Sequence, residues 1–125
     1  MRLVRPRLLR WQWSDYSAKH RDRTNLLLHI VAVPLFEVAS IALLVGIVIG
    51  SGRAAGLALA GIVAAIVIQG RGHRREREVP TPFAGPIDFV SRFVAEQWVT
   101  FTRFVLTGGW SRNLSRRPGS RSEPS

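Results

Sequence analysis

Two long apolar stretches follow one another in the middle of the chain and dominate its pattern of hydrophobic and polar positions. The first covers residues 26–49 and carries one charged side chain, Glu37, and the second covers residues 54–69 and carries none. A helix needs about 20 apolar residues to cross a hydrocarbon core of roughly 30 Å, and residues 30–49 have that length. A glycine-rich turn separates the two stretches, so the pattern predicts a transmembrane helical hairpin. A buried hairpin in a soluble protein is disfavoured, because so small a chain has little surface left to cover two helices that are apolar all round.

Weaker patterns flank this hairpin on both sides. Apolar residues recur at spacings of three and four over residues 87–107, which predicts an amphipathic helix that either lies at the membrane interface or packs on the hairpin. Its polar exceptions are Ser91, Arg92, Glu96 and Arg103. On the N-terminal side, Ser14 is expected to cap the start of a short helix. The predicted fold is therefore an all-α integral membrane protein, with one helical membrane domain over residues 14–107.

The two ends of the chain differ from this domain in composition. Residues 1–13 are basic and aromatic, which fits either a membrane–water interface or a disordered tail. Residues 108–125 are rich in Arg, Ser and Pro and are predicted to be disordered.

The charge distribution changes the interpretation of the strongly basic composition. Lys and Arg number 18 against 8 Asp and Glu, a formal net charge of +10, which indicates an anionic partner. The basic residues lie on both outer sides of the hairpin, whereas its turn holds only Arg53. The positive-inside rule then places both termini in the cytoplasm, so the expected partner is the bilayer and not nucleic acid. The chain has no cysteine, which excludes disulfides and thiolate metal ligands.

All three histidines lie at the edges of the apolar segments. His29 begins the first segment and His73 follows the second, so an antiparallel hairpin returns them to the same depth, with His20 within reach. Glu76 lies three residues after His73, on the same face if that stretch is helical. Imidazoles with a carboxylate and no thiolate favour Fe(II), Mn or Zn. The alternative is that each histidine is an ordinary interfacial residue.

Two other polar residues precede these histidines by one helical turn. Tyr16 lies four residues before His20, and Asn25 lies four before His29, so either side chain could orient an imidazole ring. Tyr16, Asn25 and Glu76 are therefore the candidate catalytic residues beside the candidate metal ligands. Arginines that follow the hairpin could pair with a substrate carboxylate, namely Arg71, Arg74 and Arg75.

The histidine spacing resembles the first motif of the Mpo1-like family, also known as domain of unknown function 962. That motif is carried here by His20, Asn25, His29, Pro34 and Leu35. The family's second motif is a Gly-His pair just after a transmembrane hairpin, with a nearby Glu and Pro, and it corresponds to Gly72, His73, Glu76 and Pro80. The resemblance covers roughly residues 11–107. Ala32 stands where the family usually has Gly, and Glu76 is one residue closer to the histidine than usual, which indicates a divergent bacterial branch.

The resemblance implies a membrane-embedded, Fe(II)-dependent dioxygenase that shortens 2-hydroxy fatty acids by one carbon in α-oxidation. His20, His29 and His73 would then be the iron ligands, and a bacterial member would lie in the cytoplasmic membrane. Two alternatives stay open. One is a non-enzymatic lipid-binding or scaffold protein, in which the histidines have no ligand role, and the other is a different metal-dependent lipid enzyme. The sequence predicts no oligomeric state.

Overall fold

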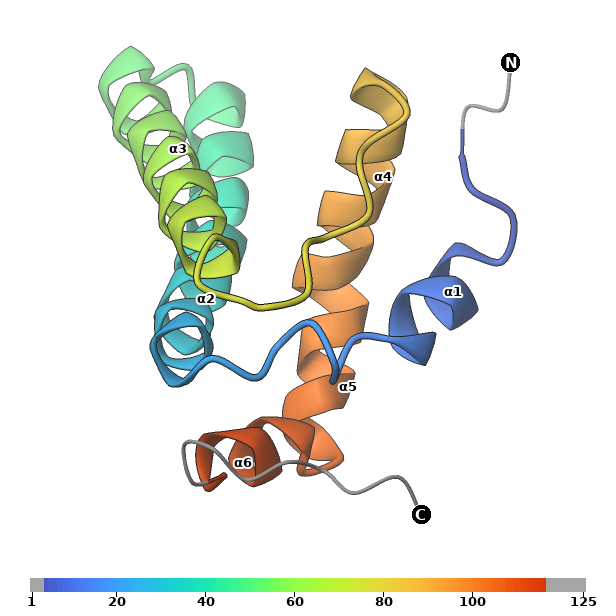
Figure 1. Cartoon of the computed structure of the whole chain (residues 1–125). Coiled ribbons are helices and arrows are strands. Elements are labelled where there is room, and N and C mark those ends of the chain that lie inside the picture. Colours follow the sequence, from blue (N-terminus) through green and yellow to red (C-terminus); the bar gives the residue numbers. More distant parts are fainter. Residues whose placement is uncertain (1–3, 117–125) are drawn as a thin grey trace.

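The computed structural model describes residues 4–116, which form helices and no strand, as predicted (Figure 1). In chain order the helices are α1 (Leu8–Ser14), α2 (Arg23–Val48), α3 (Gly52–His73), α4 (Pro86–Ala95), η1 (Glu96–Thr100), α5 (Phe101–Leu106) and α6 (Gly109–Leu114). Residues 1–3 and 117–125, which include part of the tail that we predict to be disordered, lie outside the described residues.

Helices α2 and α3 form the predicted hairpin. The Asp22 side chain accepts a hydrogen bond from Asn25 N at the start of α2, and the Ser51 hydroxyl does the same for Ala54 N at the start of α3. The two helices pack closely near the turn, because a Cβ atom on Gly46 would come within 2.8 Å of the Ala55 backbone nitrogen. Both helices are long and apolar enough to cross a membrane.

Helices α4, η1 and α5 join into one continuous helix over residues 86–106, as the amphipathic pattern predicts. Its middle part, η1, is π-helical, which the pattern does not reveal. A π-helical turn carries an extra residue relative to an α-helix and changes which side chains face inward. Here it turns Glu96, Gln97 and Thr100 toward the protein interior, where Gln97 and Thr100 are buried.

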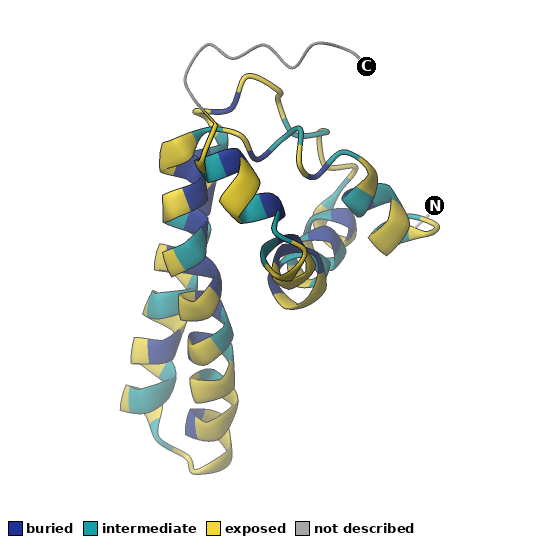
Figure 2. Ribbon diagram, turned by 90° about the horizontal axis from the view of Figure 1, so that it is seen from below, coloured by how far each residue is buried: buried dark blue, intermediate teal, exposed yellow. Residues whose placement is uncertain are grey.

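The turn end of the hairpin projects beyond the remaining elements (Figure 2). In Figure 2 it projects away from the loops, while the helix that contains α4 is seen nearly end-on beside its upper half. The core lies where α1, the start of α2 and the helix over residues 86–106 meet, around Tyr16, Leu26, Val33, Phe101 and Phe104. Helix α6 closes this end, because Trp110 Nε1 donates to the Leu26 carbonyl at 2.9 Å.

A short N-terminal helix is present, but its position differs from the prediction. Ser14 ends α1 and does not begin a helix, and its hydroxyl donates to the Trp11 carbonyl at 2.6 Å. The cause is the apolar content of residues 8–13, whose Trp13 packs against the core. Helix α6 also forms within residues that we predict to be disordered.

Candidate metal centre

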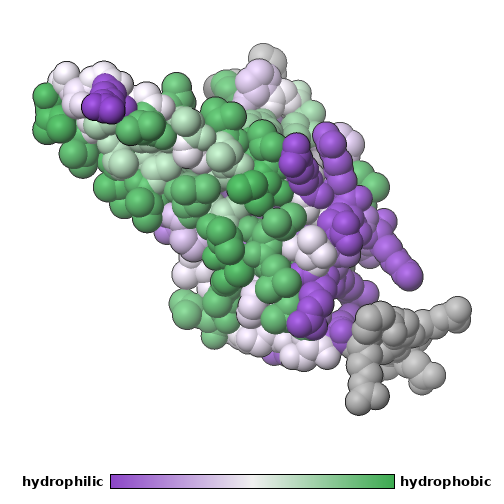
Figure 3. All heavy atoms as spheres, turned by 90° about the vertical axis from the view of Figure 1, so that its left-hand side faces the viewer, coloured by the Kyte–Doolittle hydropathy of each residue, from purple (hydrophilic) through white to green (hydrophobic). Residues whose placement is uncertain are grey.

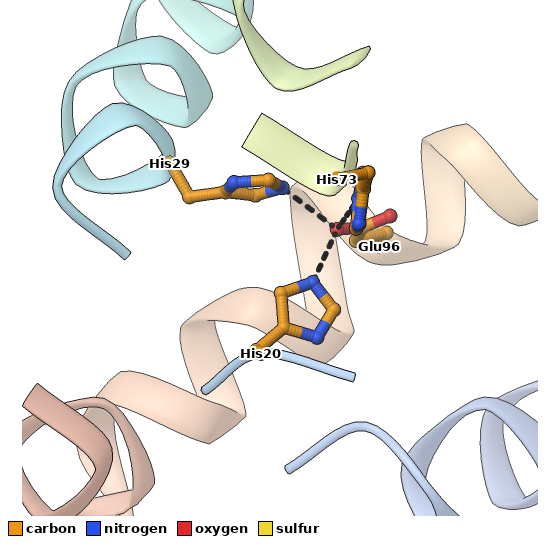
Figure 4. Close-up of side chains that lie close together, drawn as sticks. All are labelled: His20, His29, His73 and Glu96. Carbon is orange, nitrogen blue, oxygen red and sulfur yellow. Dashed lines mark ion pairs between the residues drawn. The ribbon is translucent and has the colours of Figure 1, made fainter. Parts of the chain in front are cut away.

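Four side chains from separate parts of the chain converge at the open end of the hairpin (Figure 4). His20 comes from the loop before α2, His29 from the second turn of α2, and His73 is the last residue of α3. The fourth is Glu96, the first residue of η1. One potential ligand atom from each residue lies within 4.8 Å of those of the other three. The structure therefore brings the three predicted histidines together around a carboxylate.

The carboxylate oxygen lies between the three imidazoles. Glu96 Oε1 is 3.5 Å from the Nε2 atoms of His20 and His29, and 4.0 Å from Nε2 of His73. His20 and His29 are buried, whereas the side chains of His73 and Glu96 keep 22% and 14% of their surface exposed. The cluster is thus closed on one side and reachable on the other.

Backbone carbonyls fix the orientation of two of the rings. His20 Nδ1 lies 2.7 Å from the Tyr16 carbonyl oxygen, and His29 Nδ1 lies 3.1 Å from that of Asn25. A carbonyl can only accept, so Nδ1 carries the proton in both rings and Nε2 presents its lone pair to the cluster. Both Nε2 atoms are buried without a hydrogen-bond partner. Such an arrangement is costly unless something binds the lone pairs, and it is the one that metal-binding histidines use.

Tyr16 and Asn25 therefore act on the histidines through their backbone, and their side chains have other contacts. The Tyr16 hydroxyl donates to Glu96 Oε1 at 2.9 Å, and its ring stacks on His20 with centroids 3.8 Å apart. The Asn25 amide donates to Glu76 Oε2 at 2.7 Å. The Tyr16 side chain thus lies against the cluster. Asn25 contacts His29 through its carbonyl and Glu76 through its side-chain amide.

The structure does not bring Glu76 into the cluster, in contrast to the candidate role that its spacing from His73 suggests. Helix α3 ends at His73, and the turn that follows directs Glu76 toward the start of α2. Its Oε1 accepts from the backbone N–H groups of Arg21 and Asp22, both at 2.7 Å. With Oε2 bound to Asn25, both carboxylate oxygens of Glu76 are occupied by N–H donors.

The surroundings of Glu96 and Tyr16 shift their acid–base properties. Burial alone would raise the pKa of the Glu96 carboxyl, but the neighbouring His20 and His29 outweigh burial, so this pKa lies well below its ordinary value. Burial and the neighbouring Glu96 charge raise the pKa of Tyr16 well above its ordinary value. The pair therefore consists of an ionised carboxylate and a neutral phenol that donates to it.

A cavity of about 250 Å³ adjoins the cluster. His20, His73, Glu96 and Tyr16 line it together with apolar side chains of α1, α3, α4 and the loop before α4, which are Trp11, Ile66, Phe83, Phe89 and Phe93. Its cationic lining residues are Lys19 and Arg92, and not the three arginines expected from the sequence, Arg71, Arg74 and Arg75. Arg75 instead pairs with Asp22 at 3.3 Å.

Comparison with known families gives a match over most of the chain. The family model described as "2-hydroxy-palmitic acid dioxygenase Mpo1-like" matches residues 7–107. The chain belongs to the Mpo1-like family. The matched region contains all four cluster residues and ends one residue after α5. Comparison with curated proteins and with solved structures gave no match.

The donor set of this Mpo1-like domain fits a metal ion. Two of its imidazoles present oriented, unpartnered Nε2 atoms, and a third imidazole and an ionised carboxylate complete the set. Nitrogen and carboxylate donors without thiolate suit Fe(II), Mn or Zn. Sequence reasoning found the three histidines but missed Glu96. The available signal was that Glu96 is a carboxylate on an amphipathic helix with few charged residues.

Proposed function

We propose that this protein is a membrane-embedded, Fe(II)-dependent dioxygenase that shortens a 2-hydroxy fatty acid by one carbon. The observation that carries the proposal is the convergence of three imidazoles and one carboxylate beside an apolar cavity. The description of the matching family model names a 2-hydroxy fatty acid as substrate and a dioxygenase as the activity, which supports the choice of reaction.

In this proposal His20, His29, His73 and Glu96 hold the iron. When bound, the iron supplies the Lewis acidity and the one-electron chemistry that a reaction with O2 requires. Tyr16 holds Glu96 through its hydroxyl, and the carbonyls of Tyr16 and Asn25 keep two imidazoles in the tautomer that presents Nε2. The carbonyl contacts use backbone atoms, so their effect survives many side-chain substitutions at residues 16 and 25.

The overall reaction needs no further redox cofactor. A 2-hydroxy acid and O2 give carbon dioxide, water and the carboxylic acid that is one carbon shorter. The bond between C1 and C2 breaks, and these two carbons supply all the electrons that reduce O2. The chain therefore needs to bind only the acid, O2 and the metal.

The apolar cavity walls suit the part of the acyl chain next to the reacting carbons. Pockets for whole small molecules usually measure about 300–1,000 Å³. At about 250 Å³ the cavity is smaller, so it takes the polar head and the first methylene groups, and the rest of a long chain stays outside. This division fits a substrate that remains in a bilayer, with the α2–α3 hairpin inserted beside it and both termini in the cytoplasm.

The test is the metal content and the product of the purified full-length protein. Protein purified in detergent without oxygen should contain about one iron per chain and convert 2-hydroxyhexadecanoic acid to pentadecanoic acid when O2 is admitted. His29→Ala should lose both iron and product, while Glu78→Gln, an exposed carboxylate outside the cluster, should keep both. Iron without the shortened acid would indicate a different metal-dependent reaction on lipid. No bound metal after Fe(II) is supplied would overturn the proposal in favour of a non-enzymatic lipid-binding protein.

A further inference from the structure

The outer face of α4 is apolar, exposed and covered by nothing among the described residues. Ile87, Val90, Val94 and Trp98 follow one another at helical spacing, with 42–56% of each residue exposed. Val99 and Leu9 of α1 extend this surface to the side, and these residues line a shallow groove. We define the α4 outer face as Ile87, Val90 and Val94 of α4 together with Trp98 and Val99 of the adjoining η1.

The charged residues of this part of the helix are Asp88 and Arg92 in α4 and Glu96 at the start of η1. All three side chains are turned away from the α4 outer face. Asp88 accepts from Ala84 N at 3.0 Å and pairs with Arg92, whose guanidinium also donates to the carbonyls of residues 81 and 82. Glu96 lies in the metal cluster. The one hydroxyl beside the face belongs to Ser91, and it donates to the Asp88 carbonyl at 3.1 Å. The one side-chain polar group on the face is the indole N–H of Trp98, which is 42% exposed, and tryptophan rings of this kind are enriched at the headgroup level of membranes.

The position of the face relative to the hairpin identifies its partner. In Figure 2 the exposed side of α4 points in the same direction as the hairpin turn, while the loops lie on the opposite side. In Figure 3 hydrophobic residues cover the hairpin side of the surface, and hydrophilic residues form a separate band along one edge. A helix that faced water would carry charged residues on its outer side. The apolar face of α4 thus points to the side on which the apolar hairpin projects (Figure 2).

We infer that the α4 outer face lies in the bilayer at the headgroup–acyl boundary, so that α4 is an interfacial helix beside the membrane-inserted hairpin. Such helices bury their apolar side by about 5–10 Å. The opposite side of the same continuous helix carries Phe89 and Phe93 of α4 and Glu96 of η1, which line the cavity, so one helix separates the cavity from lipid. The inference depends on insertion of the hairpin, which is part of the proposed function, and the test separates the two.

Because the chain has no cysteine, one introduced cysteine at a time can carry a spin label without any other substitution. Full-length V90C, V94C and W98C proteins would be labelled and reconstituted in bilayers of phosphatidylglycerol and phosphatidylcholine. Collision rates with O2, which is concentrated in lipid, and with a water-soluble nickel chelate would then be compared. Labels at Val38 and Leu44, which are both 66% exposed on α2, report the hairpin, and a label at Arg77 in an exposed loop reports water. Iron content of each unlabelled variant checks that the fold and the metal centre persist.

The expected result is that all three labels on the α4 outer face collide more with O2 than with the nickel chelate, at a shallow depth. The Leu44 label should lie deeper, and the Arg77 label should collide mainly with the chelate. Deep hairpin labels combined with chelate-accessible α4 labels would overturn the interfacial helix alone, and chelate-accessible hairpin labels would overturn both proposals. Depth that increases along α4 to the bilayer centre would make it a spanning helix. Labels shielded from both reagents would indicate a second copy of the chain on this face. Either result contradicts the inference.

Discussion

Asn25 and Glu76 lie 51 positions apart in the sequence and are joined by a hydrogen bond of 2.7 Å from Nδ2 to Oε2. The same carboxylate accepts from the backbone N–H of Arg21, so it ties the turn after α3 to the start of α2. His73 lies three residues before Glu76, and His20 comes just before Arg21. A contact outside the cluster therefore sets the distance between two of the candidate metal ligands.

Glu76 and Glu96 are predicted to respond differently to the same substitution. Glu76→Gln replaces a charged acceptor that faces three N–H donors, which should lower the free energy of unfolding by about 1.5–3 kcal/mol while iron still binds at saturating concentration. Glu96→Gln should leave the fold intact and weaken iron binding by at least about 10–100-fold. Thermal unfolding in detergent and iron content of both variants check this. If Glu76→Gln lost its iron at unchanged stability, Glu76 would be the ligand after all.

The sequence predicts the parts of the site that depend on the hairpin. The lengths of the two apolar segments place His29 and His73 at the same end, and the structure brings them together there. Glu96 could not be found in this way. Its position depends on how the helix over residues 86–106 packs across the end of the hairpin and on the π-helical turn at Glu96–Thr100, and neither feature has a periodic signal in the sequence. Spacing along the sequence favours Glu76 as the carboxylate ligand, because it lies only three residues after His73, whereas the carboxylate in the cluster is Glu96.

Composition also fails where a few tertiary contacts order a polar stretch. Residues 108–125 read as a disordered tail, yet Gly109–Leu114 form α6. The Asn113 amide donates to the His20 carbonyl at 2.7 Å, and the Trp110 indole N–H donates to the Leu26 carbonyl in the first turn of α2. Two such side chains are too few to change the composition of a segment, but they are enough to dock a helix of six residues.

Gly72 allows α3 to approach Asn25, which predicts a specific effect of adding one methyl group. A Cβ atom on Gly72 would overlap Asn25 Oδ1, whereas a Cβ on Gly70, two residues earlier in the same helix, would meet nothing within 4 Å. Gly72→Ala should therefore destabilise the protein by about 1–3 kcal/mol. Gly70→Ala should be neutral or stabilising by up to about 1 kcal/mol, because alanine has the higher helix propensity.

Thermal unfolding of both glycine variants gives the comparison, with the double variant Gly72→Ala, Asn25→Ala as a further test. Removing the Asn25 amide makes room for the methyl group but leaves Glu76 with one donor fewer. The two substitutions should therefore be less than additive in their cost. Equal effects of Gly70→Ala and Gly72→Ala would show that the approach of α3 to Asn25 is not close.

Gln69 and Gln97 form a reciprocal pair of hydrogen bonds, at 2.8 and 2.7 Å, that joins α3 to η1 in the protein interior. Replacing either residue by Leu leaves the other amide buried and unsatisfied, at a cost of about 1–3 kcal/mol. Replacing both removes the unsatisfied groups, so the double variant should be more stable than either single variant. Because Gln97 adjoins Glu96, the single variants should also bind iron more weakly. Single variants as stable as the unsubstituted protein would contradict the pairing.

Tyr16 is the only tyrosine in the chain, so its ionisation can be followed by the absorbance of the tyrosinate ion. In the folded, metal-free protein it should ionise well above the ordinary value of about 10, because burial and the Glu96 charge oppose the phenolate. In the denatured chain it should ionise near pH 10. The folded state thus favours the neutral phenol, so its contribution to stability is complete below about pH 10 and is lost as the pH rises toward the folded pKa.

Tyr16→Phe should remove this part of the pH dependence while the ring keeps its place on His20. It should also weaken iron binding or activity by about 10–100-fold, because Glu96 loses the donor that positions it. The control is Thr107→Ala, since the Thr107 hydroxyl donates only to the carbonyls of Arg103 and Phe104 in α5 and not to a cluster residue. Tyrosinate that formed near pH 10 in the folded protein would mean that the Tyr16 hydroxyl faces solvent and does not donate to Glu96. In that case iron binding by Tyr16→Phe would match that of the control.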